Sequence, residues 1–139
     1  MSYLLDTSVL SELTRPRPDR RVLRWFEATA EESLHLSVLS LGELRVGAEA
    51  QRDVRRREKL RVFLERDLPG RFEDRLLPVS AGVADRWGRL LAEVERTVPA
   101  IDSLLAATAL FHGLRLVTRN VRNFRFPGLH VVNPWEVGG

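Results

Sequence analysis

The stretch Tyr3-Leu4-Leu5-Asp6-Thr7-Ser8 near the start of the chain carries the pattern that decides the fold. Its three apolar residues suit a short buried strand, and an aspartate follows them at once. Similar short apolar runs recur along the chain, at residues 34–38, 76–79, 114–117 and 129–132. We expect each of these five runs to form a strand of one core sheet.

Amphipathic stretches with helix start and stop signals separate these runs. The signals are Asp19 before residues 20–30, the capping-box spacing Ser40-Leu-Gly-Glu43, Ser80 before a helix through Leu91, and Gly113 after residues 102–112. Strands that alternate with helices favour a mainly parallel sheet, because parallel strands need crossover connections. The chain is therefore predicted to be an α/β sandwich with helices on both faces of the sheet.

Composition narrows the classes of protein. The 139 residues suit a single domain over residues 1–139, and the absence of cysteine excludes disulfides and thiolate metal sites. No apolar run approaches the roughly 18 residues of a membrane span, so we expect a soluble, cytoplasmic protein. Of the 22 basic residues, only Lys59 is a lysine, and the formal net charge is +3. An excess of arginine permits a nucleic-acid partner, but the codon usage of a GC-rich genome is its main explanation, so the excess alone decides nothing.

Four polar residues fall where the predicted strands end or the next helix begins. They are Asp6, Glu43, Asp102 and Asn120. Ligands of open parallel sheets bind beyond the carboxyl ends of the strands, so these positions are the candidate site. Each also has a structural interpretation: Asp6 as a helix cap, Glu43 as part of the capping box with Ser40, and Asp102 as an acid at the positive end of a helix.

Three carboxylates at one edge of a sheet repel one another, and a divalent cation would offset that repulsion. Oxygen ligands without cysteine favour Mg²⁺, with Mn²⁺ as the other possibility. Such an ion activates water and holds a phosphodiester oxygen. Other chemistries lack support, since the chain has neither a P-loop nor a dinucleotide-binding glycine motif, and the three histidines (His35, His112 and His130) suit structural roles.

Several strings, in this order, resemble the PIN-domain ribonucleases, and most closely the FitB-like branch of the VapC toxins of bacterial type II toxin–antitoxin pairs. The strings are Leu4-Leu-Asp6-Thr7-Ser8-Val-Leu-Ser-Glu-Leu, Leu36-Ser-Val-Leu-Ser-Leu-Gly-Glu43-Leu, Asp102-Ser-Leu-Leu-Ala-Ala-Thr-Ala, Leu116-Val-Thr118-Arg119-Asn120 and Asn133-Pro-Trp. The resemblance spans almost the whole chain.

The resemblance implies a three-layer α/β/α fold with a five-stranded sheet in the order 3-2-1-4-5, and a Mg²⁺-dependent endoribonuclease that cuts RNA. Asp6 and Asp102 would bind the metal directly, and Glu43 would bind it through water or orient the attacking water. Thr7 and Ser8 would support the first acid. Such toxins are usually homodimers that a cognate antitoxin inhibits, so we expect a homodimer and a heterotetramer or larger complex with the antitoxin.

The sequence departs from the family pattern after the fourth strand. Many members place a fourth acid there, whereas this chain offers Asn120 and Asn123, with Thr118 and Arg119 as supporting residues. An amide supplies no negative charge, which favours one bound cation over two. It also leaves an alternative open, a catalytically degenerate PIN domain that binds RNA or a protein partner without cleavage.

Two expectations concern surfaces. Arg119, and with it Arg15, Arg17 and Arg45, are candidates for a positive rim around the acids, whereas the basic run 52–61 is expected to be a solvated helix face. The apolar residues Val9, Leu10, Leu13, Trp25 and Phe26 are candidates for a dimer or antitoxin surface, with burial against the chain's own sheet as the alternative.

Overall fold

The computed structural model describes residues 1–136 and contains a five-stranded parallel sheet. The strands are β1 (Tyr3–Leu5), β2 (Leu34–Ser37), β3 (Leu76–Leu77), β4 (Arg115–Val117) and β5 (Val131–Val132). Their order in the sheet is β3-β2-β1-β4-β5, which confirms the predicted topology. All strands but β1 are shorter than the apolar runs that predicted them, and His130 lies just before β5 rather than inside it.

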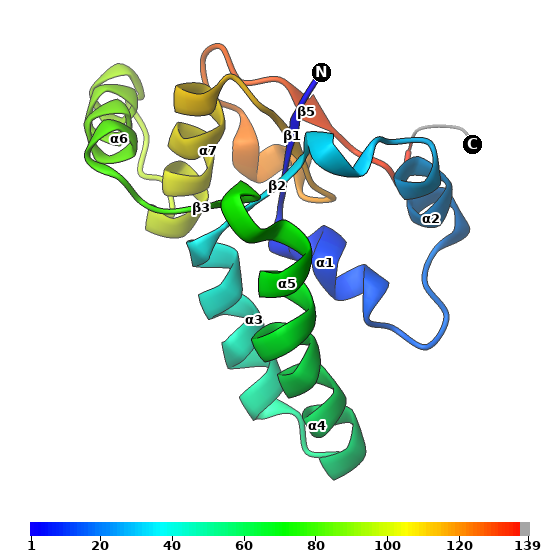
Figure 1. Cartoon of the computed structure of the whole chain (residues 1–139). Coiled ribbons are helices and arrows are strands. Elements are labelled where there is room, and N and C mark those ends of the chain that lie inside the picture. The colour runs from blue at the N-terminus through cyan, green and yellow to red at the C-terminus, as the bar shows by residue number, and fades with distance from the viewer. Residues whose placement is uncertain (137–139) are drawn as a thin grey trace.

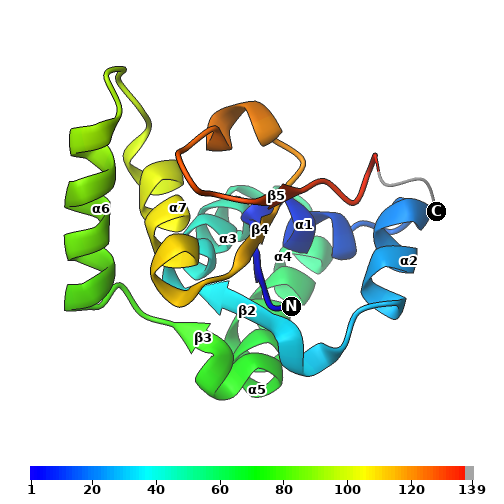
Figure 2. The same cartoon turned by 90° about the horizontal axis from the view of Figure 1, so that it is seen from above.

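Helices cover both faces of the sheet (Figures 1 and 2). They are α1 (Thr7–Leu13), α2 (Arg20–Glu27), α3 (Val38–Ala50), α4 (Val54–Val62), α5 (Leu68–Phe72), α6 (Ala81–Glu93) and α7 (Ala100–His112). A π-helical turn (Phe63–Asp67) joins α4 to α5, and a 3-10 turn called η4 (Val121–Phe124) follows β4. Figure 1 shows α3 and α4 as an antiparallel pair that extends away from the sheet.

The two faces of the sheet have separate cores because neighbouring residues of a strand point to opposite sides. Leu5 packs in one cluster with residues of α1, α2 and α5. Leu4 packs in the other with Leu90 of α6, Leu105 of α7 and Phe124 of η4. The result is the predicted three-layer α/β/α sandwich.

Helix ends mostly follow the expected signals. The side chain of Asp19 accepts a hydrogen bond from the backbone N–H of Arg21, Ser80 accepts one from Val83, and Gly113 ends α7 with a left-handed φ of 66°. The prediction of a capping box at Ser40 and Glu43 is wrong. Ser37 caps α3 instead, by accepting a hydrogen bond from Leu39 N–H. Ser40 lies fully buried inside the first turn, and its hydroxyl has no hydrogen-bond partner within residues 1–136.

Two residues proposed for a partner surface instead belong to the chain's own core. Val9 and Leu10 are buried in α1, so the alternative, burial against the chain's own sheet, is confirmed for them. Trp25 and Phe26 are partly buried and pack against the same cluster. An amphipathic pattern shows that one face of a helix is covered, but does not show what covers it.

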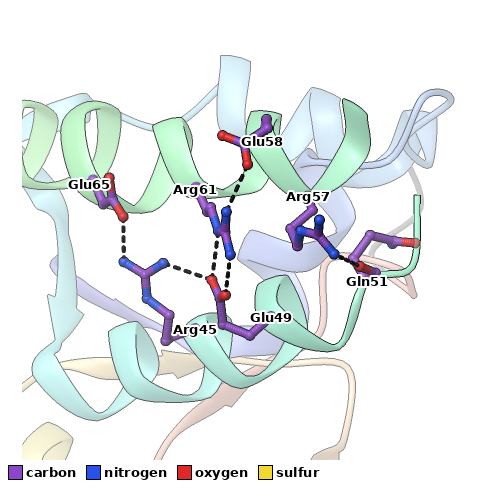
Figure 3. Close-up of polar contacts among 7 residues, drawn as sticks. All are labelled: Arg45, Glu49, Gln51, Arg57, Glu58, Arg61 and Glu65. Atoms are coloured by element: carbon purple, nitrogen blue, oxygen red, sulfur yellow. Dashed lines mark hydrogen bonds and ion pairs between the residues drawn. The ribbon is translucent and has the colours of Figure 1, made fainter. Parts of the chain in front are cut away.

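Ion pairs hold α3 against α4 and the π-helical turn (Figure 3). Glu49 of α3 accepts hydrogen bonds from Arg45 at 3.0 Å and from Arg61 of α4 at 3.0 Å. Arg45 also bonds to Glu65 at 2.9 Å. Arg45 is thus committed to this network, so its expected place on the rim of the site is wrong.

This network predicts a pH-dependent contribution to stability. Hydrogen bonds from Arg61, and then from Arg45, lower the pKa of Glu49 to about 2 from its ordinary value of 4.5. A carboxyl with a lowered pKa in the folded state stabilises the fold above its ordinary pKa, and the contribution fades as pH falls toward the folded value. We therefore expect Glu49→Gln to lower the urea midpoint at neutral pH, with the difference from the parent shrinking below pH 4.5. Glu32→Gln, at an exposed position, is the matched control, and a difference that stays constant with pH would contradict the assignment.

Candidate active site

Asp6 lies at the carboxyl end of β1, where the backbone passes from the strand into α1. Its N–H donates a hydrogen bond to Val117 O of β4 at 2.9 Å, and Asp6 is only 6% exposed. Its carboxylate oxygen Oδ2 accepts hydrogen bonds from Ser8 Oγ at 2.9 Å and from Thr118 Oγ1 at 2.7 Å. Asp6 makes no side-chain capping bond to α1, so the structural interpretation of this residue as a helix cap is wrong.

Glu43 reaches the same edge from the second turn of α3. Its Oε1 atom accepts a hydrogen bond from Thr7 Oγ1 at 2.6 Å. Ser8 supports Asp6 as predicted, but the prediction that Thr7 supports the first acid is wrong, because its hydroxyl donates to Glu43 instead. Since Ser37 rather than Ser40 caps α3, Glu43 also has no capping-box function.

Asp102 lies in the first turn of α7 and completes the group of acids. Partial burial raises the pKa of its carboxyl, and the negative charges of Asp6 and then Glu43 raise it further. The three acids predicted from separate parts of the sequence are thus close enough to repel one another.

The acids do not form a closed cage. Within the described residues, no three His, Cys, Asp or Glu side chains are placed so that they could hold a metal ion by themselves. Mg²⁺ usually keeps several waters and takes only one or two carboxylates from the protein. Oδ1 of Asp6 takes part in neither hydrogen bond of that carboxylate, and the mutual repulsion favours a cation. These features fit a partly hydrated Mg²⁺ better than a fully protein-bound ion.

The residues after β4 are tied to Asp6 through hydroxyl groups. Asn120 N–H donates to Thr118 Oγ1 at 3.0 Å, and Arg119 N–H donates to Ser8 Oγ at 3.3 Å. Thr118 is fully buried, whereas the other two are exposed. Asn123, on η4, is also exposed.

A groove of about 450 Å³ runs from this edge along α1. Ser8 and Glu43 line it at one end, together with Arg119 and Asn120, and Arg15 lines it farther along. Arg119 and Arg15 thus lie where the rim was expected, whereas Arg17 is not among the residues that line the groove.

Arg56 also lines the groove, although the run 52–61 was expected to be a solvated face. One guanidinium nitrogen donates to Thr14 O at 3.3 Å. That expectation was wrong for Arg56 because α4 folds back along α3 and brings its side chain toward α1.

The sequence reasoning missed Glu12, a groove residue that is only 4% exposed. Its carboxylate accepts hydrogen bonds from the N–H of Asp19 at 3.1 Å and from Arg15 at 3.3 Å. These bonds fix the loop between α1 and α2 beside the groove. The signal was present in the sequence as an acid within the apolar face that holds Val9 and Leu13.

The helices of residues 1–136 include none long and apolar enough to cross a membrane.

Comparison with known proteins assigns this chain to a family. The family model described as "PIN domain" matches residues 3–128. The VapC ribonuclease Y4jK of Sinorhizobium fredii is 35% identical over 136 residues, covering 96% of this chain and 97% of that protein. Toxin FitB of Neisseria gonorrhoeae is 33% identical over 136 residues, covering 96% of this chain and 98% of FitB.

A solved structure agrees with these sequence matches. The crystal structure of FitAcB from Neisseria gonorrhoeae superposes with a TM-score of 0.90 at 32% identity, covering 97% of this chain and 99% of that one. The chain therefore belongs to the PIN domain family, among relatives named as VapC ribonucleases and the FitB toxin.

Proposed function

We propose that this protein is the ribonuclease toxin of a toxin–antitoxin pair and hydrolyses RNA phosphodiester bonds with the help of Mg²⁺, or of Mn²⁺ in its place. The observation that carries the proposal is the group of Asp6, Glu43 and Asp102 at one edge of the sheet, where Ser8 and Thr118 hold Asp6 and Thr7 holds Glu43. Relatives named as ribonucleases support it, including Ribonuclease VapC4 of Mycobacterium tuberculosis at 32% identity over 135 residues.

Asp6 and Asp102 are the residues that would hold the cation. When bound, Mg²⁺ neutralises their charge, lowers the pKa of water and stabilises the charge that develops on the phosphate. Ser8 and Thr118 orient the Asp6 carboxylate through their hydrogen bonds to Oδ2, and Oδ1 takes part in neither bond. Thr7 fixes Glu43 through Oε1, so Oε2 of Glu43 is free to orient the attacking water and accept its proton. Arg119, on the rim, binds a phosphate of the RNA.

We also propose that an antitoxin protein covers the groove and that the toxin forms a homodimer, within a heterotetramer or larger complex. The support is that related solved structures are complexes, among them FitAB bound to a DNA fragment, at 29% identity and a TM-score of 0.87. Mass measurement in solution tests the homodimer, and a monomer at micromolar concentration would count against it.

The test of the activity is cleavage-site mapping on a defined single-stranded RNA with Mg²⁺, with Mn²⁺ and with a chelator. We expect cuts only when a divalent cation is present. Protein that binds this RNA and leaves it intact in both cations would instead support the degenerate PIN domain, the alternative that Asn120 and Asn123 motivate.

Thr7→Val tests the positioning of Glu43. Valine keeps the shape of threonine but removes the hydroxyl that donates to Glu43 Oε1. Loss of such a supporting hydrogen bond typically costs about 10- to 100-fold in activity, so we expect a fall in kcat of roughly that size. Thr29→Val is the matched control, because the Thr29 hydroxyl donates to a backbone carbonyl, Trp25 O, away from the acids. Equal rates for Thr7→Val and the parent would contradict the positioning of Glu43 by Thr7.

A further inference from the structure

A second hollow adjoins the groove on the side of η4. This side recess has a volume of about 460 Å³, within the range of about 300–1,000 Å³ that small-molecule sites occupy. Three arginines and three asparagines line it: Arg119, Arg122, Arg125, Asn120, Asn123 and Asn133. Among residues 1–136, Glu136 is its one acid and Val121 its one apolar residue. Such a lining suits a polar, anionic ligand.

The side recess and the groove share two lining residues. Arg119 and Asn120 line both the side recess and the groove that contains Glu43. Their backbone N–H groups bond to Ser8 Oγ and Thr118 Oγ1, and both hydroxyls donate to Asp6. Two short chains of hydrogen bonds, one through Ser8 and one through Thr118, therefore connect the lining of the side recess to Asp6.

The arginines of the side recess have no acidic partner in the part of the chain that the structure describes. Within residues 1–136, the guanidinium groups of Arg119, Arg122 and Arg125 form no ion pair, in contrast to Arg45 and Arg61 on α3 and α4. The Arg119 guanidinium lies 5.3 Å from the ring centre of Trp135, which is only 4% exposed and holds it in place. An unpaired and positioned guanidinium is suited to a phosphate.

The asparagines supply groups that read a base. Asn133 uses its Oδ1 to accept a hydrogen bond from Trp135 N–H, which gives it a structural role. The exposed side chains of Asn120 and Asn123 offer both donors and acceptors, as the edge of an unpaired base requires. By contrast, the hollow beside α4 is lined by Leu13, Leu60 and Phe63 among others, a surface better suited to an apolar side chain.

We propose that the side recess binds the nucleotide next to the cleaved bond of a single-stranded RNA. Arg119, Arg122 and Arg125 hold its phosphates, and the amide of Asn123 contacts the edge of its base. The preference of the enzyme for its cleavage site is then set partly on η4, outside the group of acids. This inference rests on the proposed ribonuclease function, whose own test is the cleavage experiment above.

The experiment measures binding separately from cleavage. Four homopolymeric single-stranded RNAs are bound to protein carrying Asp6→Asn, with Mg²⁺ present, at several salt concentrations. In that background we expect Arg122→Ala to weaken binding to all four RNAs and to reduce the slope of log affinity against log salt by about 0.7, the value for one lost contact to a single strand. We expect Asn123→Ala to reduce the preference for one base over the others by about tenfold. Arg55→Ala is the matched control, since Arg55 is an exposed arginine of α4 that lines neither hollow.

The outcomes separate the two proposals. Unchanged affinity, salt slope and base preference in both variants would overturn the inference even if the parent protein cleaves RNA. Weaker binding in Asn123→Ala that is equal for all four RNAs would overturn base contact by Asn123. Parent protein that leaves RNA uncut overturns the ribonuclease function, while the binding measurements still decide what the side recess binds. Thermal melting of each variant shows that its fold is intact.

Discussion

Asp6→Asn is expected to reduce RNA cleavage by about a thousandfold at saturating Mg²⁺. A bound cation is worth several kcal/mol of charge stabilisation in the transition state, and about 1.4 kcal/mol corresponds to a factor of ten in rate. Asparagine keeps the shape of the side chain, and its amide oxygen still accepts hydrogen bonds from Ser8 and Thr118. The substitution therefore removes one charge and replaces Oδ1, the oxygen left for the cation, by an NH2 group that cannot bind a metal ion.

We expect the thermal stability of this variant to change in a different way from its activity. Burial raises the pKa of Asp102 and the charge of Asp6 raises it further, so removal of that charge relieves a repulsion in the metal-free protein. We expect the thermal midpoint of Asp6→Asn without cation to equal or exceed that of the parent. Asp85→Asn is the matched control, because Asp85 is 67% exposed on α6 and pairs only with Arg89 among the described residues. Cleavage by Asp6→Asn at the parent's rate would end the proposed mechanism.

The sheet could be predicted from the sequence because burial leaves a local trace. Each short apolar run is a strand, and alternation with helices requires parallel pairing. The predicted ends of the strands were less accurate, because the end of a strand depends on which side chain reaches the free N–H groups of the next helix. Ser37 and Ser40 are both serines near the start of α3, so the sequence does not distinguish them as caps. Only Ser37 lies outside the helix, where its hydroxyl accepts a hydrogen bond from Leu39 N–H.

The acids were found by a rule about topology. Side chains that follow parallel strands meet at one edge, so Asp6, Glu43 and Asp102 could be grouped before their positions were known. The division of Thr7 and Ser8 between two acids required the actual path of α3. Glu12 was missed and Arg56 was misplaced because their surroundings come from other segments of the chain. Glu12 binds the backbone N–H of Asp19, and Arg56 reaches Thr14 because α4 returns toward α1.

Phe124→Ala is expected to destabilise the protein by about 3–5 kcal/mol, the usual cost of removing a buried aromatic ring. Phe124 is only 2% exposed and packs with Leu116 of β4 and Leu105 of α7. Urea unfolding measures the loss, and Val46→Ala, at a residue 72% exposed, should stay within about 0.5 kcal/mol of the parent.

The position of Phe124 extends its effect to the site. This ring anchors η4, the turn that carries Asn123 and follows Asn120 at the edge of the groove. A domain of this kind has only about 5–15 kcal/mol of stability in total, so the variant loses a large fraction of it. At temperatures where Phe124→Ala is still folded, we expect the selectivity of RNA binding to fall before the sheet unfolds, because η4 loses its main apolar contact. A variant as stable as Val46→Ala would show that η4 is held by its backbone hydrogen bonds, such as Asn123 N–H to Asn120 O, rather than by this ring.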